Sequence, residues 1–522
     1  MTRLRFILDN TLLHLLAIIL VTIAFYAGTV NNFFFADDFI WLSRVKHLPD
    51  NWSSIFTIEN RYFTPLTYIS FFANYRLSGL NPYWYHLFDL ILHTSNGILL
   101  YLLTCRISGS RLTALIAATL FTTSSSILIT VLWSSARTDL IMVFFSLATM
   151  IAFVRGGKAL PVAFYVLSLC AKGTALAIPV VLFLLTYRTE PVRSRVKNVA
   201  PYIVINVLYV SLLLLINSFG SRVIPSERIF SLTNYVRSLP SLIVPERHLA
   251  ATGTPLLLLL SIIILAVMLG IFARYDDMTA RTGIALTIFG LLPLVFTRDY
   301  VLAGNSAAAM HLLNSPSNRL YLACIGISLL YAVLFEKLTH NRFLPVRVFS
   351  VIVPLSLVCM NYFEAGLIEK KWAKGTSNVS YSIATLNRNA SMLTDNSVLL
   401  LYNFEGSSGF LTAMINSLYD LKNVKVHGLH RINVDELTNI DRSPFNKSQY
   451  EVGAANVKLI MSCNGYYFSD MLTRGGNQAL QRILADYRDL HATAIPAEEL
   501  ATRNRLEGNM SELRTRLKEC TM

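Results

Sequence analysis

The chain has 522 residues, of which 54% are hydrophobic and only 15% are charged, whereas a soluble domain usually carries about 25% charged residues. Its mean hydropathy of +0.50 excludes a disordered protein and argues against a single soluble globule. Several windows of about 20 residues lack charge and are long enough to cross a bilayer as helices. The composition therefore predicts a polytopic α-helical membrane protein.

The net charge of +14 is unevenly distributed along the chain. Residues 364–522 carry 18 basic and 17 acidic groups, whereas residues 1–363 carry 27 basic and 14 acidic groups. The excess lies among apolar segments, where it indicates membrane topology or anion binding. We therefore expect no nucleic-acid partner.

The first apolar run covers residues 6–30, directly after Arg3 and Arg5. It is longer than the apolar part of a signal peptide and lacks a small-residue cleavage site, so we expect a retained helix. Further spans are predicted at residues 84–104, 112–132, 138–154, 198–218, 253–272, 283–297, 319–335 and 345–363.

The apolar residues 159–187 are interrupted by Ala171-Lys172-Gly173 and are short for two full spans. The positive-inside rule requires them to enter and leave on one side, so we expect two short or broken helices with Lys172 at the turn. This gives about 11 spans and an extracytoplasmic C-terminus. The basic residues then expected in the cytoplasm are Arg3, Arg5, Arg106, Arg111, Arg155, Lys158, Arg188, Arg193, Arg195, Lys197, Arg274, Arg281, Lys337, Arg342 and Arg347.

The expected organisation is a transmembrane module over residues 1–363, with outer loops at 31–83 and 219–252, followed by a soluble domain over 364–522. Residues 219–252 are typical of an amphipathic helix on the outer leaflet or of a solvated loop helix. In the tail, strand-like runs at 397–402, 424–426 and 457–462 alternate with helical stretches such as 478–490 and 511–518. They predict an extracytoplasmic α/β or α+β domain.

Two groups of polar residues stand out near the first outer loop. Asp37 and Asp38 are adjacent carboxylates at a membrane boundary, where one can act as a general base while the other orients it, binds a metal or holds the loop. Alternatively, either caps the following helix. His86, Asp89, His93 and Asn96 share one helical face, which favours interhelical hydrogen bonds over a metal site. No cofactor is required, although a divalent metal stays open.

Several short motifs follow one another over residues 1–335. In chain order they are Ala36-Asp37-Asp38, Arg61 with Pro65-Leu66, residues 77–82, Tyr85-His86, His93, residues 133–140, Ala171-Lys172-Gly173 and residues 317–322. The series resembles the protein O-mannosyltransferase-like enzymes of the GT-C fold, especially the group whose eukaryotic members carry tetratricopeptide repeats. This chain departs from the group in lacking repeats, in having Asp89 where the group has Asn, and in having Gly173 where the group has Glu.

The resemblance implies a glycosyltransferase that takes a sugar from a polyprenyl-phosphate donor on the outer face of the membrane, with inversion expected. Such a reaction needs a base for the acceptor, cations for the leaving phosphate and a groove for the prenyl chain. By the resemblance, Asp37 is the expected base and Asp38 the second choice. The expected phosphate-binding cations are Arg137, Lys172 and Arg319, and the expected substrate contacts are Arg61, His86 and Asp139.

Each cation has a simpler interpretation. Arg137 can pair with Asp139, Lys172 can extend to the interface, and Arg319 can be a boundary residue. The expected partners are a lipid-linked sugar, a lipid, glycan or protein acceptor, and membrane lipids. We expect a bacterial inner-membrane protein with a periplasmic C-terminal domain. The alternatives are a transporter or flippase of lipid-linked sugars and a non-catalytic membrane anchor.

Overall fold

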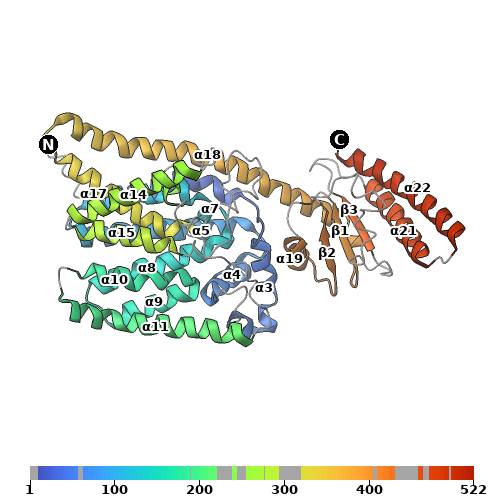
Figure 1. Ribbon diagram of the computed structural model, residues 1–522, viewed down its shortest axis with the longest axis horizontal. Helices are drawn as coiled ribbons and strands as arrows, with labels where there is room; N and C mark the ends of the chain where they lie inside the picture. Colours follow the sequence, from blue (N-terminus) through green and yellow to red (C-terminus); the bar gives the residue numbers. More distant parts are fainter. Residues whose placement is uncertain are drawn as a thin grey trace. The chain divides into compact units, whose positions relative to one another are not determined.

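The structure, a computed structural model, describes residues 10–56, 63–187, 190–219, 238–243, 254–274, 277–292, 319–402, 404, 408–429, 457–461, 470–492 and 495–521. The chain forms two compact units (Figure 1). The helical unit comprises Met1–Asn32 and Leu48–Ala373, and the C-terminal unit comprises Phe33–His47 and Lys374–Met522.

This division differs from the expected boundary between residues 363 and 364 in two ways. The expected boundary lies inside one continuous helix, α18 (Leu344–Arg388). In addition, residues 33–47 of the first outer loop belong with the tail, because α3 (Asp38–Lys46) packs against α19 (Ser408–Leu418). Contacts so distant in sequence leave no local signal in the chain.

The helical unit is built from helices, some of which begin at a side chain that accepts the first backbone amides. The helices of this unit are α2 (Thr11–Tyr26), α4 (Pro65–Ser78), α5 (Pro82–Ser108), α6 (Arg111–Thr122), α7 (Leu128–Leu132), α8 (Arg137–Val154), α9 (Ala159–Ala171), α10 (Ile178–Leu185), α11 (Val192–Phe219), α14 (Thr254–Arg274), α15 (Met278–Gly290), α17 (Tyr321–Thr339) and α18. In α5, for example, the Asn81 side chain accepts the Tyr83 amide and Pro82 occupies the first turn. Gly109 ends that helix at a φ of 71°.

Within the described residues, six helices are long and apolar enough to cross a membrane, or seven if the bent pair Arg111–Thr122 and Ser125–Leu132 counts as one span. This part of the chain does not reach the expected 11 spans. Helices α9 and α10 are shorter apolar helices, and α15 has only 13 residues. The prediction of two short helices around Lys172 is confirmed, because Lys172 ends α9 in an extended conformation before a 3-10 turn leads into α10.

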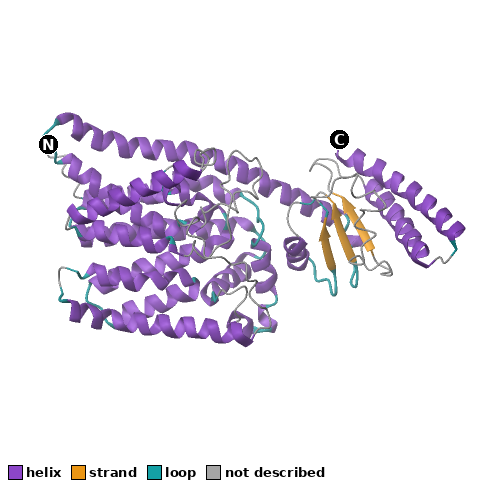
Figure 2. Cartoon of the chain, viewed as in Figure 1, coloured by secondary structure: helices purple, strands orange, loops and turns teal. Residues whose placement is uncertain are grey.

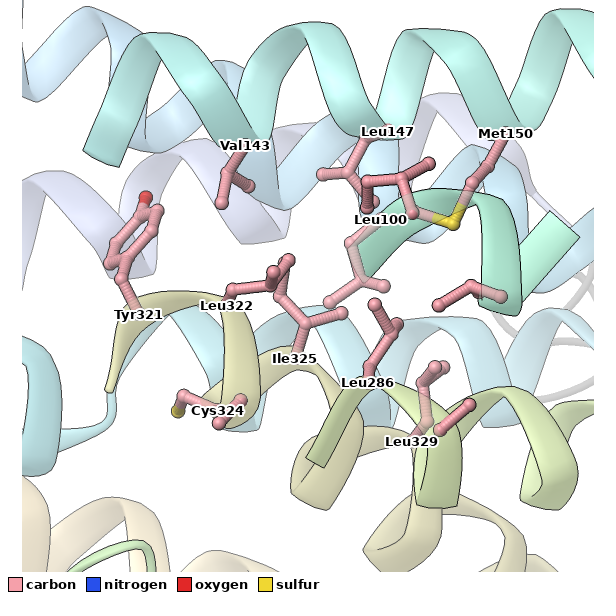
Figure 3. Packing of buried hydrophobic residues seen from close by; sticks show 14 of the residues in the cluster. Leu100, Val143, Leu147, Met150, Leu286, Tyr321, Leu322, Cys324, Ile325 and Leu329 are labelled. Carbon is pink, nitrogen blue, oxygen red and sulfur yellow. The ribbon is translucent and has the colours of Figure 1, made fainter. Parts of the chain in front are cut away.

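The core of the helical unit lies where α5, α8, α15 and α17 meet. Figure 3 shows Val143 and Leu147 of α8 pointing toward Leu322 and Ile325 of α17. Helices α15 and α17 approach closely at glycines. A Cβ on Gly326 would lie 2.4 Å from the carbonyl oxygen of Gly283. Small residues at such crossings let two helix backbones pack directly.

The C-terminal unit contains a parallel three-stranded sheet in the order β2-β1-β3 (Figure 2). Its strands are β1 (Val398–Tyr402), β2 (Lys425–Gly428) and β3 (Val457–Met461), close to the three strand-like runs of the sequence. Strand β1 is central and wholly buried, as expected for a parallel strand with an unbroken apolar run. Helices α21 (Asp470–Ala492) and α22 (Pro496–Thr521) share a hydrophobic cluster with the sheet.

Two contacts fasten α3 within the C-terminal unit. The rings of Phe39 and Phe410 meet edge to face at 5.5 Å. At the other end of α3, the Lys46 ammonium lies 2.7 Å from the Asp420 carboxylate and donates to the Ser417 carbonyl at 3.4 Å. The segment that begins with the acidic pair is therefore held by the tail of the chain.

Candidate functional site

A buried ion pair joins α5 to the start of α8. The Arg137 Nε donates to Asp89 Oδ1 at 2.5 Å, and its other two nitrogens donate to Asn74 Oδ1 at 2.6 Å and to the Tyr85 carbonyl at 3.0 Å. The second carboxylate oxygen of Asp89 accepts the Ser134 hydroxyl at 2.8 Å. Arg137 therefore pairs with Asp89 and not with Asp139, the partner suggested by sequence proximity.

The surroundings of this pair enclose it completely. The Arg137 guanidinium carbon lies 4.4 Å from the centre of the Phe71 ring and 4.8 Å from that of Phe88. Both Arg137 and Asp89 are fully buried or nearly so. One positive charge meets one negative charge, and every guanidinium nitrogen has an acceptor. We call Asp89 and Arg137 the balanced pair.

The rest of the polar face of α5 forms hydrogen bonds between helices, as the sequence pattern predicts. His93 Nε2 lies 3.2 Å from the Thr122 carbonyl, which can only accept. The His93 Nδ1 lies 2.7 Å from the Tyr321 hydroxyl. The oxygen of this hydroxyl also accepts a hydrogen bond from the Asn96 side-chain amide at 3.0 Å. His86 is buried too, with Nδ1 at 3.4 Å from the Ser134 hydroxyl.

A second ion pair lies at the break between α9 and α10. The Lys172 ammonium donates to Asp139 Oδ2 at 2.5 Å, and the positive charge of Arg319 acts on the same carboxylate. Asp139 stands in the first turn of α8, where the helix dipole favours a negative charge. Arg319 is half-buried, two residues before α17.

These three residues, which we call the ionic centre, differ from the balanced pair in charge. Among the residues that the structure describes here, two cations act on one carboxylate, so the ionic centre carries a surplus positive charge. The Lys172 side chain is 17% exposed, whereas the Arg137 side chain is wholly buried. A surplus of cationic hydrogen-bond donors at a helix break can receive an anion such as a phosphate.

In the C-terminal unit, the two adjacent carboxylates have different surroundings. Asp38 is fully buried and its Oδ2 accepts the Phe35 amide at 2.9 Å, so it closes the turn before α3. Asp37 occupies the cap position of α3, yet its side chain makes no capping hydrogen bond and is exposed. The capping interpretation therefore does not hold for Asp37, and Asp38 has the loop-holding role.

The backbone before Asp37 is strained. Ala36 has a φ of 51°, a left-handed conformation that costs an L-residue about 1–2 kcal/mol. Protein around the Asp37 carboxyl raises its pKa above the ordinary value, and the Arg44 guanidinium opposes that rise. A strained turn that presents a carboxylate with a raised pKa has the features of a general base.

The structure brings together only some of the predicted site residues. Lys172 pairs with Asp139, on which the charge of Arg319 also acts, whereas His86 and Arg137 belong to the network around Asp89. Arg61 and residues 220–237 and 244–252 of the predicted loop 219–252 lie outside the described residues. In the described part of the chain, no group of three or more His, Cys, Asp or Glu side chains is arranged to hold a metal ion.

Sequence reasoning missed three polar residues of these networks. Asn74 accepts from Arg137, Ser134 donates to Asp89, and the Tyr321 hydroxyl links His93 to Asn96. Ser134 and Tyr321 lie inside motifs that the sequence analysis identified, so their position next to Arg137 and Arg319 was an available signal. Asn74 offered none beyond being an amide within a largely apolar helix.

No protein-family model matches the sequence, and no curated protein matches it. Among solved structures, the chain is similar to an oligosaccharyltransferase from Archaeoglobus fulgidus tethered with an acceptor peptide, with 11% identity and a TM-score of 0.47, over 79% of this chain and 64% of that one. It is also similar to the arabinofuranosyltransferase AftD from Mycobacteria, with 14% identity and a TM-score of 0.45, over 76% and 29% of the two chains. A third is ArnT from Cupriavidus metallidurans bound to undecaprenyl phosphate, with 13% identity and a TM-score of 0.45, over 82% and 88%.

Proposed function

We propose that this protein is a membrane glycosyltransferase of the GT-C type that moves a sugar from a polyprenyl-phosphate donor to an acceptor. The observation that carries the proposal is the ionic centre, in which Lys172 pairs with the Asp139 carboxylate and the positive charge of Arg319 acts on the same group. Its surplus positive charge suits the phosphate of a leaving lipid. The ordered motifs of residues 1–335 support the same reaction class.

The proposed reaction is a single displacement. Asp37 takes the proton from an acceptor hydroxyl or amine, and the acceptor atom attacks the anomeric carbon of the donor sugar. The bond between that carbon and the phosphate oxygen breaks, and the lipid phosphate leaves with the electron pair. Attack opposite the leaving group inverts the anomeric centre. Arg319 and Lys172 stabilise the negative charge that develops on the phosphate.

The balanced pair has a different role in this proposal. Arg137 begins α8, and Asp139 lies in the first turn of the same helix. By tying that turn to α5, the Asp89–Arg137 pair fixes where Asp139 presents its carboxylate to Lys172. We therefore assign Arg137 and His86 to positioning, and phosphate binding to the ionic centre.

The packing of α3 supports the proposed topology. Residues 33–47 follow the first span and contact α19 of the tail, so both segments must lie on the same side of the membrane. If the N-terminus is cytoplasmic, that side is the outer face. We propose a bacterial inner-membrane protein whose C-terminal unit is periplasmic and holds the Asp37 turn in place.

The decisive test is sugar transfer in membranes supplied with labelled polyprenyl-phosphate hexoses and native acceptors. Asp37→Asn removes the base while keeping the size of the side chain, and we expect transfer to fall by about 10²–10⁴-fold. Asp50→Asn, a change of another exposed carboxylate in the same predicted outer loop, is the matched control and should transfer normally. Full activity of a well-folded Asp37→Asn protein excludes Asp37 as the base.

The same assay separates the proposal from transport. A wild-type protein that forms no labelled product with any donor, but moves lipid-linked sugar across vesicle membranes, would be a flippase. Donor-dependent product that is lost in Asp37→Asn but kept in Asp50→Asn supports a transferase.

A further inference from the structure

We propose that Arg195, Arg281 and Tyr187 form a binding site for the phosphate group of an anionic lipid, at the end of the helical unit opposite the ionic centre. This site is separate from the proposed sugar transfer. It would take the phosphate headgroup of a bilayer lipid on the cytoplasmic side.

Arg195, near the start of α11, has a buried charge of which two nitrogens lack an acceptor among the described residues. Its side chain is only 5% exposed, and its guanidinium carbon lies 4.5 Å from the Phe183 ring centre and 4.9 Å from that of Tyr187. Its Nε and Nη1 are buried and have no hydrogen-bond partner within the described structure. Buried donors of a charged group are costly to leave unsatisfied, so this geometry calls for an anionic acceptor.

A second arginine approaches the same aromatic ring from another helix. The Arg281 guanidinium carbon of α15 lies 4.0 Å from the centre of the Tyr187 ring. Two guanidinium groups therefore lie against one tyrosine ring, which stabilises each through its π face. An anion beside this ring would supply the acceptor that the buried Arg195 nitrogens lack.

Two described acidic residues that lie near these arginines in the sequence, Glu190 and Asp277, have other partners. Glu190 accepts the Ser194 hydroxyl and the Asn198 amide, each at 2.6 Å. Asp277 caps α15 by accepting the Thr279 amide at 2.8 Å, and its other oxygen lies 3.8 Å from the Lys337 ammonium. Neither carboxylate accepts a hydrogen bond from the Arg195 Nε or Nη1.

The path of the chain places this site at the opposite membrane interface. Lys172 precedes α10 and Tyr187 follows it, while Arg319 precedes α17 and Lys337 lies in its last turn. A helix of 19 residues, such as α17, is about 28 Å long, close to the thickness of the hydrocarbon layer. Tyr187 is 47% exposed, so a headgroup can reach it. The positive-inside pattern of the sequence assigns this end to the cytoplasm.

The test measures thermal unfolding and lipid adducts, by native mass spectrometry, of the full-length protein in a neutral detergent. Phosphatidylglycerol is compared with phosphatidylcholine and with inorganic phosphate. We expect phosphatidylglycerol to raise the unfolding temperature and to form retained adducts. Arg195→Gln should weaken that affinity at least tenfold, and Arg193→Gln, an exposed arginine of the same helix, should not change it.

Each outcome is informative. A shift with phosphatidylglycerol alone identifies a lipid headgroup, and an equal shift with inorganic phosphate identifies a free phosphate as a second source. Arg281→Gln, on another helix, gives an independent variant if Arg195→Gln does not fold. The proposal is wrong if both variants keep the full response, or if no anion stabilises the wild-type protein.

Discussion

The helical unit contains two ion pairs built from the same kinds of groups but with opposite properties. The Asp89–Arg137 pair is buried, neutral and saturated with hydrogen bonds. The Asp139–Lys172 pair is partly exposed and has Arg319 as an extra cation. In the Asp89–Arg137 pair every guanidinium nitrogen already donates to the protein, whereas the surplus positive charge beside Asp139 can attract an anionic ligand.

The same contrast divides the acidic residues of the C-terminal unit. Asp38 is buried and committed to the Phe35 amide, whereas Asp37 is exposed, follows a strained Ala36 and caps nothing with its side chain. In both units, one charged group secures the backbone from which its neighbour is presented. Adjacent charges in a sequence can thus have unlike roles, and burial and charge balance distinguish them.

The largest expected effect is the loss of stability when one residue of the balanced pair is replaced. Arg137→Met leaves Asp89 as an uncompensated buried charge, which should lower the free energy of unfolding by about 3–5 kcal/mol. The measurement is denaturant unfolding of the purified protein in detergent. The double variant Asp89→Leu with Arg137→Met removes both charges and should recover most of the loss. If the single variant is as stable as wild type, the pair does not secure α8.

Substitutions of Arg319 test the role of the ionic centre. Arg319→Gln removes a cation from the ionic centre without leaving a buried charge, so stability should change little. Donor-dependent transfer should fall by about 10²-fold, or about 2.7 kcal/mol of transition-state stabilisation. Arg319→Lys keeps the charge and should retain part of the rate. A large loss of stability in Arg319→Gln would place this residue with the balanced pair instead.

The sequence predicted features that depend on local pattern. The spacing of His86, Asp89, His93 and Asn96 identified an interior polar face, and the short length of residues 159–187 identified a break at Lys172. Neither inference needed distant contacts.

Ion pairs between residues far apart in the sequence could not be predicted from local patterns. Arg137 is two residues from Asp139 and 48 from Asp89, yet it pairs with Asp89 because α5 and α8 pack together. Likewise, Lys46 meets Asp420 across most of the chain. The charge surplus that singles out the ionic centre appears only once each cation has been matched with its carboxylate.

Replacing Asp38 should lower the stability of the protein moderately, because Asp38 holds the turn and is not the proposed base. Asp38→Ala removes a buried acceptor from the Phe35 amide and should cost about 1–3 kcal/mol of unfolding free energy. Asp37→Ala removes an exposed carboxylate and should leave stability within about 0.5 kcal/mol of wild type. Thermal unfolding of the two variants side by side checks this, and equal losses would remove the distinction between them.

The smallest expected effect is a shift in the pH dependence of transfer. As a base, Asp37 must be ionised, so activity should rise with pH through its pKa, which the protein around the carboxyl raises above the ordinary value. Arg44 opposes that rise, so Arg44→Gln should move the acidic limb of the kcat/KM profile to higher pH while leaving the plateau rate unchanged. The matched change Arg76→Gln, at the end of α4 in the helical unit, should leave the limb where it is. Removal of Arg44 must raise the pKa of Asp37. If the acidic limb does not move in Arg44→Gln, the limb reports the ionisation of a different group.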